Sequence, residues 1–136
     1  MLLIFNGFSF FISHFSFSFH FSFLISHFFK MQARFIHDGK AIDFLSTTDI
    51  PAGSVVIQGS LVGVTKLDLK ANTLGALHVV GVYDVEKSNV AVPLGSVVYW
   101  DATAKKAVVA ASGNTRIGVA VGEAAAGDET VRVRLG

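Results

Sequence analysis

Ile-Pro-Ala-Gly-Ser-Val-Val, residues 50–56, returns further along the chain as Val-Pro-Leu-Gly-Ser-Val-Val, residues 92–98. In each copy the proline fixes φ in a turn, the glycine ends the turn without steric cost, and Ser-Val-Val enters a strand. The segments downstream of the two copies match as well, with Val-Gly-Val at 62–64 and Ile-Gly-Val at 117–119. The sequence therefore predicts two related turn-and-strand units, the second carrying an insertion that includes residues 100–106. The alternative is a common turn device that the chain uses twice.

Short β-branched runs separated by Gly, Pro, Asn and Asp fill residues 31–136, and no long window carries a helical apolar stripe. The clearest run is 130–135, where Val131, Val133 and Leu135 alternate with polar residues, as in a half-buried antiparallel strand. The predicted strands are 34–37, 42–45, 54–58, 61–65, 76–85, 97–101, 107–110, 115–124 and 130–135. This spacing predicts an all-β fold, a small β-barrel or β-sandwich. A short helix within 67–74 or 102–111 remains an alternative.

The first 29 residues have another composition. They contain no charged side chain and eleven of the 13 Phe, and Lys30 is the first charge. We favour a mis-set start codon, with the working chain beginning at Met31. A membrane or sorting segment and a genuine arm are the alternatives; a signal peptide is disfavoured because the basic leader and the small-residue cleavage site are missing. The predicted organisation is a Phe/Ser-rich extension over 1–30, outside the fold, and a β-rich domain over 31–136.

Composition and motifs argue against nucleic-acid binding, metal binding and catalysis. Lys+Arg is 11 and Asp+Glu is 10, which gives no electrostatic footprint for nucleic acid, and cysteine is absent. His37 and His78 are far apart in the sequence, so a metal site built on them is a minor alternative, as is an acid–base pair of Asp84 and Glu86 on one strand face. No nucleophile, phosphate-loop or metal-ligand motif occurs. We expect no catalytic, cofactor or metal site, and a protein that is not an enzyme.

A few residues are candidates for an interface. Arg132 and Arg134 share one face of the last strand, and Arg116 and Lys66 are candidates to join them in pairing with carboxylates of a partner. Tyr99 and Trp100 are neighbours on a strand, so they point to opposite faces. We expect Trp100 to be an interface or rim anchor, because Trp is enriched in binding hot spots; core packing is the alternative.

Seven segments in a fixed order carry a resemblance to a known family. They include Phe-Ile-His-Asp-Gly at 35–39, both proline turns, Leu-Val-Gly-Val at 61–64, Gly-Val-Tyr-Asp-Val at 81–85, Ile-Gly-Val-Ala at 117–120 and Gly-Asp-Glu-Thr-Val-Arg-Val-Arg-Leu at 127–135. In this order they resemble the phage capsid-cement (head decoration) family over residues 31–136. The Phe-rich extension has no counterpart in that pattern.

The resemblance implies a non-enzymatic phage or prophage protein that binds the outer capsid surface and stabilises the shell. Its partners would be the major capsid protein and copies of itself, with a trimer favoured. It would lie on the virion surface, and in the bacterial cytoplasm before assembly, with no cofactor and no nucleic acid bound. Two other functions remain open: a membrane-tethered β-barrel module anchored by residues 1–29, and a small ligand-binding β-barrel.

Overall fold

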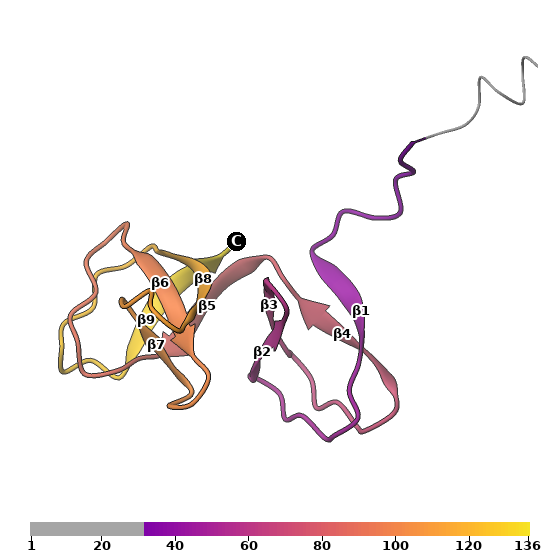
Figure 1. Ribbon diagram of the computed structural model, residues 1–136, viewed down its shortest axis with the longest axis horizontal. Helices are drawn as coiled ribbons and strands as arrows, with labels where there is room; N and C mark the ends of the chain where they lie inside the picture. The colour runs from indigo at the N-terminus through magenta and orange to yellow at the C-terminus, as the bar shows by residue number, and fades with distance from the viewer. Residues whose placement is uncertain (1–31) are drawn as a thin grey trace, which may run out of the picture. The chain divides into compact units, whose positions relative to one another are not determined.

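The computed structural model describes residues 32–136, and the part of the chain from Asp38 to Gly136 forms one compact unit. Nine strands in this part of the chain form two antiparallel sheets (Figure 1). The helices considered for 67–74 and 102–111 are not found: turns and bends lie there, together with the start of β4 at Leu74 and strand β7 at residues 106–108. The interpretations of residues 1–30 as a mis-set start, a membrane segment or an arm lie outside the described residues.

The first sheet has four strands in the order β1-β4-β3-β2, with bounds Ala41–Leu45, Leu74–His78, Leu61–Val64 and Val55–Gln58. The second has five in the order β5-β9-β8-β6-β7, with bounds Gly81–Glu86, Thr130–Leu135, Thr115–Ala120, Val97–Asp101 and Lys106–Val108. The predicted all-β class is confirmed. Neither sheet closes into a barrel, although one isolated bridge joins Lys87, just after β5, to Ala107 in β7.

Three strand predictions need correction. Residues 34–37 form no strand, and the strand ladders use residues from Ala41 onward. The single strand predicted over 76–85 is two strands in different sheets, because the chain changes direction at Gly81, whose φ of 139° is a conformation that glycine tolerates. The strand predicted over 115–124 ends at Ala120; a bend comes after it, and Ala124 pairs with Val92 in an isolated bridge.

The two sheets repeat one strand arrangement. β1, β4, β3 and β2 of the first repeat (residues 41–78) correspond in order to β5, β9, β8 and β6 of the second repeat (residues 81–135), and β7 is an addition. The residue pairing is conserved between the repeats as well. Corresponding pairs include Ala41–His78 and Val82–Arg134, Ile42–Leu77 and Tyr83–Val133, Asp43–Ala76 and Asp84–Arg132, and Val64–His78 and Val119–Arg134. The prediction of two related units is therefore confirmed.

The two proline turns also make the same hydrogen bonds. The Gly53 amide donates to the Thr65 carbonyl at 2.6 Å, and the Gly95 amide donates to the Ala120 carbonyl at 2.8 Å. Both glycines have φ near +80°, at 79° and 81°, where a side chain would be strained. In each turn the serine hydroxyl donates back to the proline carbonyl, Ser54 to Pro51 and Ser96 to Pro93. The Pro-x-Gly-Ser pattern thus has the same structural role twice.

A close backbone approach is repeated too. A Cβ added at Gly63 would lie 2.9 Å from the carbonyl oxygen of His78, and one added at Gly118 would collide with the carbonyl oxygen of Arg134. His78 and Arg134 occupy the same position in the two repeats. Only glycine fits where β3 approaches β4 and where β8 approaches β9 so closely.

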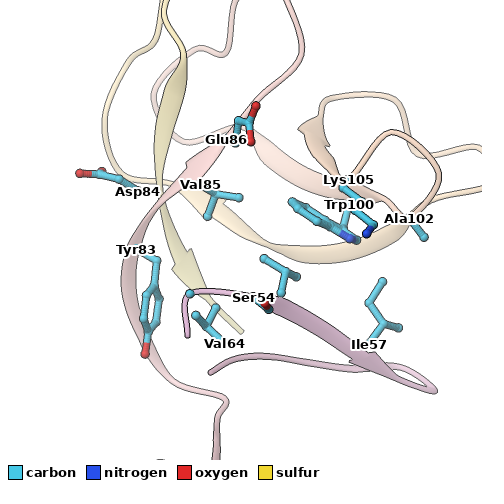
Figure 2. Close-up of a pocket in the computed structure, with 12 residues that line it drawn as sticks. Ser54, Ile57, Val64, Tyr83, Asp84, Val85, Glu86, Trp100, Ala102 and Lys105 are labelled. Carbon is cyan, nitrogen blue, oxygen red and sulfur yellow. The ribbon is translucent and has the colours of Figure 1, made fainter. Parts of the chain in front are cut away.

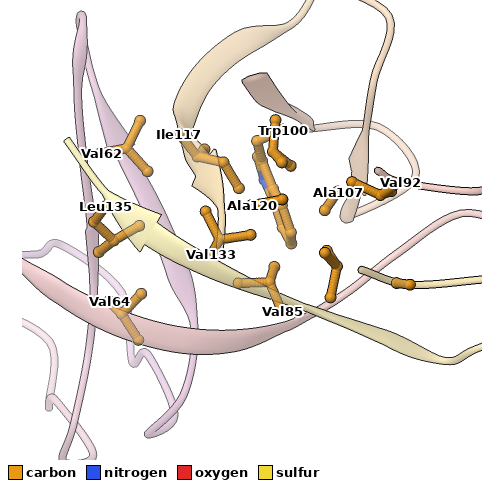
Figure 3. Close-up of a cluster of buried hydrophobic side chains, with 13 residues drawn as sticks. Val62, Val64, Val85, Val92, Trp100, Ala107, Ile117, Ala120, Val133 and Leu135 are labelled. Carbon is orange, nitrogen blue, oxygen red and sulfur yellow. The ribbon is translucent and has the colours of Figure 1, made fainter. Parts of the chain in front are cut away.

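The main core belongs to the second repeat and is completed by the first. Val98 and Val133 are fully buried in it. Trp100 belongs to the same cluster, and Figure 3 shows it with Val133. Val62 and Val64 of β3 belong to the same cluster, with only 8% and 6% of their surface exposed. The first repeat therefore covers one side of the second repeat's core.

Candidate functional site

The outer face of the second sheet presents the basic residues that the sequence singled out. Along β9, Val131, Val133 and Leu135 are buried while the residues between them are exposed, as the alternation predicts. Arg132 and Arg134 therefore lie on the outer face of the sheet. Arg116 is also exposed, on the neighbouring strand β8. Lys66 comes after β3 in the first repeat, so it is not part of this sheet.

Arg132 is paired within the chain. It lies directly opposite Asp84 in the ladder between β5 and β9. Its Nε donates to Asp84 Oδ1 at 2.8 Å and its Nη2 donates to Oδ2 at 2.9 Å, a two-pronged geometry. The hydrogen bonds from Arg132 hold the pKa of Asp84 below its ordinary value, and the same contact raises the pKa of Arg132. Arg132 therefore brings a largely compensated charge to any partner.

Arg116 and Arg134 differ from Arg132 in this respect. The ion pairs among the described residues join Lys70 to Asp49, Lys106 to Glu86 and Arg132 to Asp84, so neither Arg116 nor Arg134 is neutralised there. In the ladders Arg134 pairs with Val119, and Arg116 pairs with Tyr99. The structure thus brings two uncompensated cations together with apolar side chains on one sheet face, which suits a protein interface.

Trp100 lies in the core and not on the surface. Only 9% of its surface is exposed, while Tyr99 is half-buried on the other face of β6. The opposite placement expected for these neighbours is therefore found. One side of Trp100 lines a cavity of about 480 Å³. A role for Trp100 at an interface stays a prediction.

The cavity lies between strands of the two repeats (Figure 2). Its apolar lining comes from β2 and β3 on one side and from β5 and β6 on the other, and includes Val55, Ile57, Val64, Val85 and Trp100. Ser54 is also on the wall, with its hydroxyl engaged by the Pro51 carbonyl. The carboxylate of Asp84 points away from the interior (Figure 2).

The two carboxylates considered as an acid–base pair are both held by cations. Asp84 and Glu86 alternate with buried residues on β5, so they share a face as predicted. Asp84 pairs with Arg132, and Glu86 Oε1 lies 3.5 Å from the Lys106 ammonium. The contacts that the structure shows for these carboxylates are thus cross-strand ion pairs.

Within residues 32–136 no three His, Asp or Glu side chains gather in a way that would hold a metal ion. The same part of the chain contains no helix long and apolar enough to span a bilayer. Sequence reasoning missed one buried charge there, Lys87, which is 3% exposed. Its ammonium donates to the carbonyls of Ser88, Val90 and Ala126 at 3.1, 3.0 and 3.2 Å. Lys87 thus joins two loops, and no sequence pattern marks it.

Comparison with protein families gives a match to the phage cement protein model over residues 36–135. The match runs through both repeats, from just before β1 to the end of β9. The chain belongs to the phage cement protein family. This confirms the family that the ordered motifs indicated. Comparisons with curated proteins and with solved structures gave no match to this cement protein.

Proposed function

We propose that this cement protein binds the outer surface of a phage capsid and stabilises the assembled shell by contact, without catalysis. The family match across both repeats supports this function. The proposed partners are the major capsid protein and further copies of the same chain, with a trimer as the favoured assembly. The proposed locations are the virion surface and, before assembly, the bacterial cytoplasm.

The mechanism is mechanical. Each copy that bridges adjacent capsid subunits adds buried area, so local opening of the shell has to break more contacts. An interface of standard size, about 1,600 Å² in total, is enough for specific attachment of each copy. The exposed β9 side of the second sheet suits this role, since Arg134 is uncompensated and Arg132 presents a fixed ion pair. Carboxylates on the capsid surface are the complementary groups.

Co-sedimentation tests the proposal. The full chain is mixed with expanded capsid shells of its own phage, and bound protein is measured as a function of concentration and salt. We expect saturable binding, and shells that release their DNA at a higher temperature once decorated. Failure to sediment with the shells contradicts the proposal. Arg134→Glu should weaken binding, whereas Lys70→Glu, on an exposed loop of the first repeat, is the matched control.

The start of the working chain needs a separate measurement. Intact-mass spectrometry of the protein from its natural source distinguishes a chain that begins at Met31 from one that carries residues 1–30. A mass that includes the Phe-rich extension would favour the membrane-tethered alternative over a mis-set start.

A further inference from the structure

The two repeats contact each other through two different faces. The docking face belongs to β2 and β3 of the first repeat and consists of Val55, Ile57, Val62 and Val64. The receiving face belongs to the second repeat and consists of Tyr83, Val85, Trp100 and Leu135. Members of both faces form one core cluster (Figure 3) and line the same cavity (Figure 2). The contact between the repeats is therefore head-to-tail.

Each face has a counterpart in the other repeat, because the strand order is shared and the register of β1–β4 matches that of β5–β9. The β6–β8 ladder matches β2–β3 at Val97 and Val98 and shifts its register after Val98. The second repeat has its own docking face on β6 and β8, made of Val97, Tyr99, Arg116 and Val119. The first repeat has its own receiving face, made of Ile42, Phe44, Gln58 and Val79. The chain thus contains two docking faces and two receiving faces. One docking face and one receiving face form the contact within the chain, and the other two remain unused.

Part of each unused face is more exposed than its counterpart in the contact within the chain. In the contact within the chain, Val64 and Leu135 are 6% and 3% exposed. On the unused docking face Val97 is 38% exposed and Arg116 is exposed. On the unused receiving face Phe44 is only half-buried, although its counterpart in the second repeat is buried.

We propose that the second repeat's docking face packs onto the first repeat's receiving face in a second copy of the chain, reproducing the contact that joins the repeats within one chain. Such a contact is heterologous, so it generates a closed ring when the rotation between copies closes and a filament when it does not. A trimer built this way is a ring of alternating first and second repeats. The proposal rests on the homo-oligomer in the proposed function and names its surfaces.

The contact between copies differs from the internal one in polarity. A register shift between Val98 and Tyr99 places Arg116 opposite Tyr99, whereas Val62 lies opposite the corresponding Ile57 in the first repeat. Gln58 stands where the second repeat has Trp100. Both changes exchange an apolar side chain for a polar one. This fits an interface whose two sides are solvated before assembly, because such interfaces are more polar than a domain core.

Thiol crosslinking tests the geometry directly, since the chain contains no cysteine. Val97→Cys marks the unused docking face and Ile42→Cys marks the unused receiving face. Their counterparts, Val55 and Tyr83, line one cavity within the chain. The full-length variants are treated with a short bismaleimide, alone and on capsid shells, and are then analysed by denaturing gel and mass spectrometry.

The proposal predicts a crosslinking pattern that differs from the pattern expected for a two-fold contact. Either single variant alone should give monomer, a mixture of the two should give covalent dimer, and the double variant should give a ladder of higher masses. Self-crosslinking of a single variant would show a two-fold contact and overturn the proposal. Absence of the mixed dimer, both free and on shells, would overturn it as well.

A charge variant separates this contact from capsid binding. Val97→Asp should shift the assembly to monomer in light scattering, with Trp100 fluorescence unchanged because Val97 points away from the core. Val82→Asp is the matched control, on the outer face of the same sheet but at its β5 edge, and should leave the assembly intact. If the chain sediments with shells but the mixed dimer is absent, the inference fails and the proposed function stands. If the mixed dimer forms but the chain does not sediment with shells, the proposed function fails and the contact between copies stands.

Discussion

Gly118 gives the sharpest test of how the repeat is packed. A methyl group at this position would collide with the carbonyl oxygen of Arg134 on β9, which is a backbone atom held in the ladder between β8 and β9. Overpacking that a side chain can relieve costs about 1–3 kcal/mol. Here the ladder itself must move, so we expect Gly118→Ala to lose about 3 kcal/mol of unfolding free energy, the upper end of that range.

Two other glycines calibrate the effect. Gly63→Ala meets the equivalent oxygen of His78 at 2.9 Å, farther than the contact at Gly118, and also meets the side chain of the fully buried Leu77. Because the backbone clash is milder, its loss should be smaller, about 2 kcal/mol. Gly127 has no neighbour within 4 Å of an added Cβ and no positive φ. Gly127→Ala should change stability by at most about 0.5 kcal/mol, because it touches no special feature of the fold.

Urea unfolding followed by fluorescence measures these differences. Trp100 is the single tryptophan of the chain and is buried, so its emission reports loss of the core. With a slope of about 1.5 kcal/mol per M, a loss of about 3 kcal/mol lowers the urea midpoint by roughly 2 M. If the midpoint of Gly118→Ala equals that of Gly127→Ala at the same slope, the close approach of β8 and β9 is not a packing constraint and the reasoning is wrong.

Three further results are expected from the same measurement. Lys87→Met should lose about 2 kcal/mol or more, because three carbonyls in two loops lose their shared donor; Lys70→Met, an exposed ion-pair partner, should lose little, and equal losses would contradict the role of Lys87. Val133→Ala should lose about 2.5 kcal/mol through a cavity at a fully buried site, and an unchanged midpoint would show that the core is not closed there. Asp84 has a lowered pKa in the folded state, so its contribution to folding stability is complete above the unfolded-state pKa of about 3.9 and is lost as the pH falls through the folded-state pKa. Asp84→Asn should therefore reduce the loss of stability below about pH 4. Identical plots of stability against pH for the variant and the parent chain would contradict the contact with Arg132.

Much of this fold can be predicted from local sequence patterns. The alternation in 130–135 indicated both the strand and the face of each residue, and the two proline turns revealed the internal repeat before any pairing was known. The boundary at Gly81 was not readable, because the apolar run through it has the same strand character on both sides. Only the assignment of β4 and β5 to different sheets shows that the chain changes direction there.

The candidate site was harder to predict for the same reason. Asp84 and Arg132 are distant in sequence, and their pairing depends on the register between β5 and β9. The burial of Lys87 depends on two loops that approach each other in space. Alternation placed Trp100 and Tyr99 on opposite faces but could not say which face the first repeat covers, so the core position of Trp100 became evident only in the structure.

The added strand β7 has a practical consequence. The first repeat passes from β2 to β3 through a tight turn at Gly59 and Ser60, whereas the second repeat inserts a longer excursion at the same place without losing the shared ladders. The tip of that excursion, at Thr103 and Ala104, is exposed. A foreign peptide fused between these two residues would extend from a site that already accommodates extra sequence, so an antigen or an affinity tag could be displayed there once per copy while the sheet beneath it stays unchanged.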